Sequence, residues 1–435
     1  MKQKVIVLSM DAMVGEDVEY LKSKPNFSRL FANCAQVGKV CTIYPSITYP
    51  AHVSIMTGCR AGKHGVFTNG EFKTTGGSTK WHLESSCVKV PDVFDAVKRA
   101  GGTTAAVYWP ITGNNPNIDY LINEYFFPDP AEDVEAGYVK FGANEETLQV
   151  IRENMHRYPT SYRNRQGKLQ LHHTFDDFIM GCACTLIRKH QPDLLMIHNC
   201  FPDTLRHRHG VFNDLVREGL DQTDLWLGEM IDAMEDAGTL QDTNFILLSD
   251  HGQMDFVRRL KFNVLLRRGG FVDVDENGAV TDWRAFAQSN GMSVTVFVKN
   301  PEDKPAVRAY LEKLQSEEVW GVGKIRTEAE AREAYGMYGD FAFIVETDGY
   351  TAFGDGWQEP LINPVDLSDY RLGQATHGYE PEKGPQPVFV ASGPAFKSGA
   401  YLENACVIDE APTVAAILGG NMPEAEGRCL QELLK

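Results

Sequence analysis

The chain has 435 residues, of which 43% are hydrophobic, so it can bury a large core and exceeds the usual length of one domain. Its 42 basic and 59 acidic side chains give a formal net charge of −17. This charge argues against binding a nucleic-acid polymer, because affinity for a phosphate backbone comes from Lys and Arg contacts. A small anionic substrate would need a local positive charge, which bound metal ions can supply.

The N-terminal segment MKQKVIVLSMD contains an apolar stretch that Asp11 interrupts too soon for a secretory signal. No apolar run approaches the roughly 20 residues of a membrane span, so we expect no membrane partner. The nine cysteines are odd in number and irregularly spaced, which favours a reduced, cytoplasmic location. The sequence does not predict an oligomeric state.

Short apolar runs alternate with longer helical patterns along the chain, which is typical of parallel strands joined by crossover helices. We therefore predict an α/β fold, with a large, mostly parallel sheet flanked by helices. The predicted strands of this sheet cover residues 4 to 10, 104 to 109, 193 to 198, 244 to 249 and 387 to 391.

A predicted helix over residues 50 to 57 opens with Pro50 and stops at Gly58, in keeping with proline in first turns and glycine just beyond helix ends. Thr48 would then lie just before the helix N-terminus. Free backbone N–H groups and the helix dipole favour an alkoxide or a phosphoryl oxygen at that position. A second helix, over residues 91 to 100, has the same signals.

A long stretch with its own pattern separates His251 from His377. It contains predicted strands at 292 to 300 and 341 to 346 and a predicted helix at 304 to 316. We predict a smaller α+β insertion over residues 255 to 375, set into a core formed by residues 1 to 254 and 376 to 435. Residues 111 to 172 are predicted to be irregular and to lie over one edge of the site.

Acidic and histidine residues occur where strands of the sheet are expected to stop. Asp11 and the pair Asp250-His251 each end an apolar run, and Asp203 and His207 form a D-x-x-x-H pattern. Functional residues gather beyond the carboxyl ends of strands in open parallel sheets, so these positions can converge. Each pattern alone is also compatible with a structural role, such as a helix N-cap.

Taken together with Thr48 and His377, these residues predict two neighbouring divalent metal ions. Two ions roughly 4 Å apart can polarise a phosphoryl oxygen and stabilise the leaving oxygen of an in-line displacement. A mixed set of carboxylates and imidazoles suits zinc, whereas an all-oxygen set would suggest magnesium or calcium. Manganese or iron can also occupy such a site.

The chain order of several motifs resembles the alkaline phosphatase superfamily, and within it the type I phosphodiesterase/nucleotide pyrophosphatase family. The motifs are MDAM, PSITYPAHVSIMTG, GKHGVFTNG, SDHG and ATHGY, and the likeness covers segments of residues 4 to 110, 174 to 253 and 374 to 420. The resemblance implies an alkaline phosphatase-like core and a hydrolase that cleaves phosphodiester or pyrophosphate bonds. A small phosphodiester or nucleotide-like molecule would be the substrate.

The resemblance also implies individual roles. Thr48 would be the nucleophile, coordinated to the second metal, and would form a phosphothreonine intermediate. Asn69 would donate its side-chain amide to a phosphoryl oxygen in the transition state, although an Asn-Gly turn explains it equally well. One metal would be held by Asp203, His207 and His377, and the other by Asp11, Asp250 and His251.

The match departs from the family around the nucleophile. Ala51 stands where the animal members associated with nucleotides usually have Asn, which makes nucleotide preference less secure than diester chemistry. Tyr49 and His198 fall where that branch presents rings to a nucleobase, so stacking on a substrate base and ordinary packing are both open for them. The remaining histidines, including His52, match no ligand pattern.

Three other functions are compatible with parts of the pattern. A phosphonoacetate-type C–P hydrolase or a phosphomonoesterase would use the same threonine and the same bimetal site. A non-enzymatic, metal-stabilised binding protein would tolerate loss of the nucleophile, which Thr48 argues against. Sulfatases of the same superfamily are excluded because the chain has no Cys-x-Pro-x-Arg motif.

Overall fold

The computed structural model describes residues 3–74, 80–125, 133–158, 173–365, 368–369 and 371–435. Its largest feature is an eight-stranded sheet with the strand order β19-β2-β18-β6-β1-β5-β3-β4. β1 lies in the centre of this sheet, parallel to β5 and β6. The bounds are β1 Lys4–Met10, β2 Ala35–Cys41, β3 Thr104–Val107, β4 Tyr120–Ile122, β5 Leu194–Asn199, β6 Thr243–Leu248, β18 Phe389–Ser392 and β19 Tyr401–Cys406.

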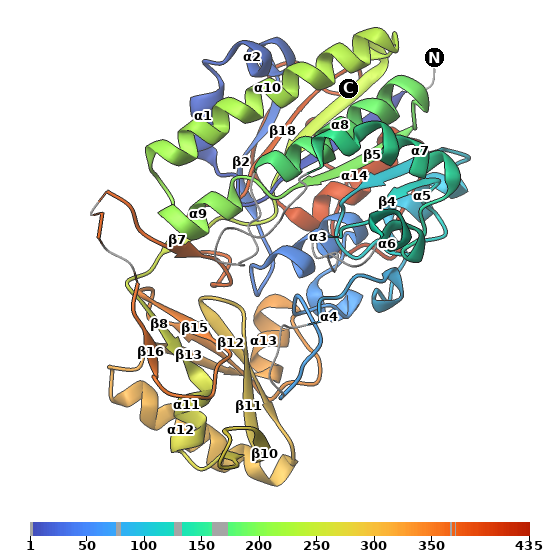
Figure 1. Cartoon of the computed structure of the whole chain (residues 1–435). Helices are drawn as coiled ribbons and strands as arrows, with labels where there is room; N and C mark the ends of the chain where they lie inside the picture. Colours follow the sequence, from blue (N-terminus) through green and yellow to red (C-terminus); the bar gives the residue numbers. More distant parts are fainter. Residues whose placement is uncertain (1–2, 75–79, 126–132, 159–172, 366–367, 370) are drawn as a thin grey trace.

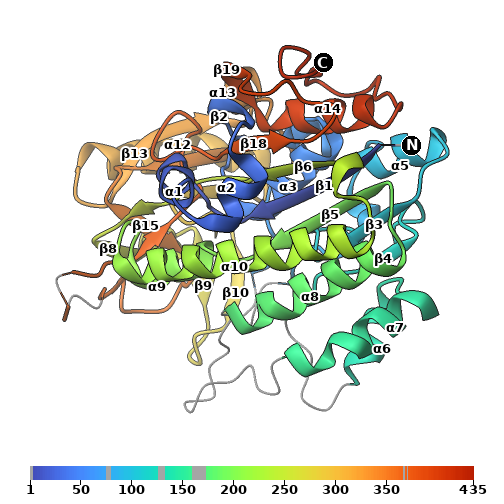
Figure 2. The same cartoon turned by 90° about the horizontal axis from the view of Figure 1, so that it is seen from above.

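Helices cover both faces of the sheet, as Figure 2 shows from above. Ile6 and Leu8 of β1 pack against one helical layer, and Val5 and Val7 pack against the other. Burial on both sides explains why the central strands are continuous apolar runs rather than alternating ones. The first layer holds α1 Gly15–Leu21, α2 Pro25–Phe31, α8 His173–Lys189 and α10 Asp214–Asp236, and the second holds α3 Thr48–Thr57, α5 Val93–Arg99 and α14 Glu410–Ile417.

All five predicted strands of the large sheet are present, but β18 runs antiparallel to both of its neighbours. Phe389 at the start of β18 pairs with Leu248 at the end of β6. The chain therefore enters β18 from the carboxyl edge of the sheet, without a crossover helix to reverse its direction. The prediction of an α/β fold with a mostly parallel sheet is confirmed, and the parallel direction of this one strand is corrected.

Residues 255 to 375 build a second lobe, which lies below the large sheet in Figure 1. It contains the antiparallel sheet β11-β12-β14-β13 and a hydrophobic cluster of its own. β7 Met254–Asp255 pairs with β17 Ala375–Thr376 where the chain leaves and re-enters the core. The lobe has the predicted α+β character, and its status as a separate domain stays a prediction.

The elements of the insertion follow the predicted positions closely: the predicted helix and both predicted strands are present. The bounds are β8 Arg258–Lys261, α11 Phe262–Arg268, β9 Val272–Val274, β10 Val280–Trp283, β11 Ala285–Ser289, β12 Ser293–Val298, α12 Lys304–Ser316, β13 Val322–Thr327, α13 Glu328–Tyr335, β14 Phe343–Thr347, β15 Thr351–Gly354 and β16 Ile362–Asn363.

Residues 111 to 172 are more regular than predicted. Besides β4 they contain α6 Val134–Lys140 and α7 Glu145–Asn154. The N-cap side chains of these helices, Asp133 and Asn144, accept the backbone N–H groups of Glu135 and Thr147, respectively. The remaining parts of this region, 126 to 132 and 159 to 172, lie outside the described residues. Among the described residues, no helix combines the length and apolar character needed to cross a bilayer.

Candidate active site

The carboxyl edge of the large sheet collects the acidic residues expected there. Asp11 follows β1, and its backbone N–H donates to the carbonyl of Asn199 at the end of β5, 2.9 Å away. The N–H of Asp203, the first residue of α9 Asp203–His209, donates to the carbonyl of Asp11 at 3.0 Å. Asp250 and His251 follow β6 on the other side of β1. Backbone pairing of adjacent strands therefore brings residues distant in sequence to one place.

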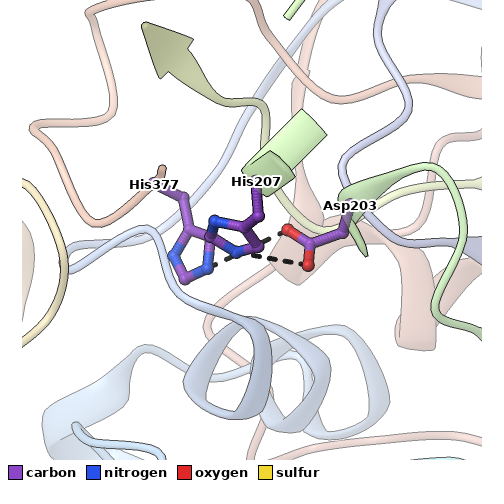
Figure 3. Close-up of side chains that lie close together, drawn as sticks. All are labelled: Asp203, His207 and His377. Carbon is purple, nitrogen blue, oxygen red and sulfur yellow. Dashed lines mark ion pairs between the residues drawn. The ribbon is translucent and has the colours of Figure 1, made fainter. Parts of the chain in front are cut away.

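Asp203, His207 and His377 form the first group of donor atoms, drawn in Figure 3, with all three ligand atoms within 4.8 Å of one another. His207 Nε2 lies 3.3 Å and His377 Nε2 lies 4.0 Å from the Asp203 carboxylate. His207 Nδ1 lies 2.8 Å from the carbonyl of Ala375. A carbonyl at one ring nitrogen fixes the tautomer and leaves the other nitrogen for a metal.

Asp11, Asp203 and His251 form the second group, again within 4.8 Å. Asp203 thus belongs to both groups and lies between them. Asp250 Oδ2 lies 3.2 Å from His251 Nε2, while its Oδ1 accepts the backbone N–H of Ala12 at 3.2 Å. The structure brings together all six predicted acidic and histidine ligands, and their ligand roles stay predictions.

Thr48 is the first residue of α3 rather than the residue before the helix. The helix starts two residues earlier than predicted because Pro50 falls in the first turn, where its missing N–H would have had no intrahelical acceptor. Thr48 Oγ1 lies 3.2 Å from His251 Nε2 and is mostly buried. The hydroxyl is therefore placed beside the second donor group.

Asn69 lies next to this helix start. Its Oδ1 accepts the backbone N–H of Tyr49 at 3.1 Å. Because the carbonyl end of the amide is used for this bond, the orientation of the side chain is fixed, and the amino end is left for another acceptor. This geometry fits the predicted contact to a phosphoryl oxygen, which stays a prediction.

Burial and charge shift the titration of the acidic residues. Burial raises the pKa of Asp11 well above its ordinary value, and the charges of Asp250 and Asp203 raise it further. Burial also raises the pKa of Asp250 to about 7. For Asp203, burial alone would raise the pKa, but His207, His377 and His251 together outweigh it, so the pKa of this carboxyl is lowered. Such a cluster of buried carboxylates is costly without a cation.

Two of the three histidines of the site, His251 and His377, are suited to act as neutral ligands. Burial lowers the pKa of His251 well below its ordinary value, with His377 adding to the effect, and burial lowers the pKa of His377 to about 4. For His207, burial would lower the pKa, but Asp203 and the Ala375 carbonyl together outweigh it, so the pKa is raised. Asp11 Oδ1 and Asp250 Oδ2 are buried with no hydrogen-bond partner among the described residues. Neutral imidazoles, carboxylates and orphaned oxygens together fit two divalent cations, without fixing their identity.

Two positions that the motifs did not predict contact this site. The Gln253 amide donates to the carboxylate and, at 3.2 Å, to the carbonyl of Asp203. His52, buried one turn after Thr48, has Nδ1 2.8 Å from the Thr48 carbonyl and 3.4 Å from Asp250 Oδ2. The i, i+4 spacing of Thr48 and His52 was the available sequence signal, and nothing in the sequence pointed to Gln253.

The two residues predicted to contact a nucleobase are inside the protein. Tyr49 is 0% exposed and its ring packs edge-to-face on Trp81, with centroids 4.9 Å apart. His198 is 1% exposed, and its Nε2 lies 3.3 Å from Asp11 Oδ2. Both rings are therefore held by contacts inside the protein. Their predicted contact with a substrate base stays a prediction.

Known proteins with similar sequences share one activity class. The chain is 21% identical to human ectonucleotide pyrophosphatase/phosphodiesterase family member 5 over 406 residues, which cover 91% of this chain and 70% of that protein. It is 20% identical to venom phosphodiesterase 2 of Crotalus adamanteus over 90% of this chain but only 42% of that protein. The chain therefore spans less than half of this venom relative.

Solved structures agree on the fold. The murine ectonucleotide pyrophosphatase/phosphodiesterase 5 superposes with a TM-score of 0.66 at 18% identity, covering 100% of both chains. The human counterpart gives 0.67, also at 18% identity and full coverage. The murine protein is also known as an inactive threonine-to-alanine variant in complex with AMP.

The family model of type I phosphodiesterases/nucleotide pyrophosphatases matches residues 5–380, most of the chain. This match confirms the resemblance read from the motifs and the predicted enzyme class of phosphodiesterase/nucleotide pyrophosphatase. Candidate Asp and His clusters agree with the metal dependence of that class. The chain belongs to the type I phosphodiesterase/nucleotide pyrophosphatase family, whose members hydrolyse phosphodiester and pyrophosphate bonds.

Proposed function

We propose that the chain hydrolyses small phosphodiesters or pyrophosphates, through a covalent phosphothreonine intermediate on Thr48, with two divalent metal ions bound. The observation that carries this proposal is the position of Thr48 Oγ1, 3.2 Å from His251 Nε2 at the first turn of α3. A hydroxyl at a helix start beside two groups of Asp and His donors is arranged for attack on phosphorus. Bound cations would neutralise the carboxylates, favour the threonine alkoxide and polarise the phosphoryl group.

In the first step the Thr48 hydroxyl gives its proton to solvent, and its oxygen forms a bond to phosphorus. The bond from phosphorus to the leaving oxygen breaks, and the first product departs. In the second step water attacks the same phosphorus from the side that the leaving group vacated, and the bond from phosphorus to the Thr48 oxygen breaks. One proton of the water restores the Thr48 hydroxyl, the other passes to solvent, and the second product is released. Asn69 would donate its amino group to a non-bridging oxygen in both steps, because its carbonyl end is held by Tyr49.

We propose that both metal ions are zinc. Three histidines and three carboxylates lie at the site, and imidazole with carboxylate is a donor set that zinc favours. Asp203, His207 and His377 would hold one ion. Asp11, Asp250 and His251 would hold the other, with Asp203 close to both.

A nucleotide is the substrate class that we propose, on the strength of family membership and of the AMP complex of the murine relative. Ala51 argues against a strict nucleotide requirement. To identify the preferred substrate class, kcat/KM is measured for a panel of dinucleotides, nucleotide sugars and lipid head-group diesters. The cytoplasmic location stays a prediction.

A comparison of bis(4-nitrophenyl) phosphate with 4-nitrophenyl phosphate, with zinc present, tests the proposed reaction. We expect the diester to have the higher kcat/KM and Thr48→Ala to lose activity by at least about 10³-fold. Thr57→Ala is a matched control, because it removes the same atoms at the far end of α3, where Oγ1 donates to the Val53 carbonyl at 2.6 Å. Monoester preference, or full activity of Thr48→Ala, would refute the proposal.

A further inference from the structure

The insertion contacts the segment that carries His377. This segment, residues 375 to 380, begins with β17 at the junction of the two lobes and leads into the core. The His377 ring stacks on His251 with centroids 4.2 Å apart, at an interplanar angle of 29°. The place of this ring therefore depends on where the backbone of the segment is held.

On one side, the core holds this segment through Ser46, two residues before Thr48. The Gly378 N–H donates to the Ser46 carbonyl at 2.9 Å, and Ser46 Oγ donates to the carbonyl of Tyr379 at 2.8 Å. The loop that precedes the proposed nucleophile and the loop that follows His377 are thus hydrogen-bonded to each other.

On the other side, the insertion holds the same segment with residues at the start of β12. The Met292 N–H donates to the His377 carbonyl at 2.8 Å, and Ser293 Oγ donates to the Gly378 carbonyl at 2.6 Å. Gly291 has a φ of +94°, and a Cβ built there would lie 2.5 Å from the His377 carbonyl oxygen. A side chain at position 291 would be strained by its backbone conformation and would force the His377 backbone to move.

Glu346 of β14 adds a further connection from the insertion. Its fully buried carboxylate accepts the Tyr44 hydroxyl at 2.7 Å and the Glu380 N–H at 3.1 Å. Tyr44 precedes Ser46 in the nucleophile loop, and Glu380 follows His377. One side chain of the insertion therefore binds both loops of the core.

We infer that the insertion is a positioning element of the metal site, in which Gly291, Ser293 and Glu346 fix the His377 loop and thereby set the metal affinity of the group Asp203, His207 and His377. The inference rests on the proposed function, because it requires a metal at this group. Partners that orient a metal ligand typically change affinity by about 10- to 100-fold when they are removed.

Zinc titration of the metal-free full chain against a chromophoric chelator tests the role of Ser293. We expect Ser293→Ala to weaken one of two zinc sites by about 10-fold or more and to leave the other unchanged. At saturating zinc, the diesterase rate of Ser293→Ala should recover to near that of the wild type. Thr243→Val is a matched control: it also removes a buried hydroxyl that donates to a carbonyl, that of Thr239 at 2.8 Å, in the core and outside the His377 loop.

A pair of glycine variants separates loop displacement from backbone strain. Gly270 also lies in the insertion with a positive φ, +76°, but an added Cβ there meets nothing within 4 Å. Gly291→Ala should lose zinc from one site even when circular dichroism shows a folded chain, whereas Gly270→Ala should keep both ions.

Unchanged zinc affinity in both Ser293→Ala and Gly291→Ala, with two ions on the wild type, would overturn this inference alone. A wild-type chain that binds no zinc would overturn the proposed bimetal function and the inference with it. If Thr243→Val weakens zinc binding at the same site as much as Ser293→Ala does, the inference is also overturned, because the effect would then be one of general stability.

Discussion

Thr48 Oγ1 and His251 Nε2 lie 3.2 Å apart although 203 residues separate them in the chain. The contact joins the start of α3, on one side of the large sheet, to the residues that follow β6 in its centre. It places the only hydroxyl proposed as a nucleophile next to the donor group formed by Asp11, Asp203 and His251.

Asn69 should act on the transition state rather than on substrate binding. Asn69→Ala removes the amino group that the contact with Tyr49 leaves for substrate. We expect kcat for the diester to fall by about 10²- to 10³-fold with little change in KM. Steady-state kinetics of the purified variant measure this split. An increase confined to KM would mean that Asn69 binds the ground state and the transition state equally and gives no specific stabilisation to the transition state.

Substitution of His377 should affect one metal, whereas substitution of Asp203 should affect both. His377 belongs to one donor group, but Asp203 belongs to two. At equal free zinc, native mass spectrometry should find one ion on His377→Ala and less than one on Asp203→Asn. Hydrolysis of the covalent adduct should slow in His377→Ala, so that a modified Thr48 is visible by intact mass during turnover. Full metal loading and a normal rate in either variant would contradict the ligand assignment.

The buried ion pair of Arg206 and Asp17 should contribute strongly to stability. The Arg206 guanidinium is fully buried and lies 2.7 and 2.8 Å from the two oxygens of the Asp17 carboxylate, and it also donates to the Val211 carbonyl at 3.1 Å. We expect Arg206→Met to lower the free energy of unfolding by about 3 kcal/mol or more, because a carboxylate is left unpaired.

The double variant Arg206→Met, Asp17→Asn is the control for this pair. It should lose less stability than the sum of the two single variants, by about 1 kcal/mol or more. Urea denaturation measures all three values. Strict additivity would show that the two side chains act independently.

Glu124 should make stability depend on pH. Burial raises the pKa of Glu124 from 4.5 to about 8, and the nearby Tyr49 hydroxyl only partly opposes this. Because the folded-state pKa is raised, the stabilising contribution is present below about pH 4.5 and is lost as pH rises through about 8. Glu124→Gln keeps the size of the side chain and removes this dependence.

Urea unfolding of metal-free wild type and Glu124→Gln at pH 5 and pH 9 measures the effect. The variant should gain stability relative to the wild type as pH rises, by an amount on the order of 4 kcal/mol. A stability difference that does not change with pH would mean that the Glu124 carboxyl titrates normally.

The positions of several site residues were predictable because strand ends are visible in the sequence. Asp11 and the pair Asp250-His251 each terminate a buried apolar run, and parallel strands bring such ends together. Thr48 was located by the proline and glycine that bound its helix, with an error of two residues. Local patterns of this kind specify where an element starts and stops.

Features that depend on long-range contacts were not predictable in the same way. An apolar run does not encode strand direction, so β18 was expected to be parallel although the chain enters it from the site edge. The contact of Gln253 with Asp203 and the contacts of Glu346 with two core loops join residues far apart in sequence. For α6 and α7, in contrast, the caps Asp133 and Asn144 are local signals that the sequence itself carries.

Counting the metal ions on the purified wild-type chain tests the central claim most directly. Native mass spectrometry after zinc loading, with diesterase activity measured on the same sample, should find two ions per chain at full activity. Chelation should remove both ions together with the activity, and added zinc should restore them. A chain that reaches its full diesterase rate with a single bound ion, or with none, would contradict the bimetal account.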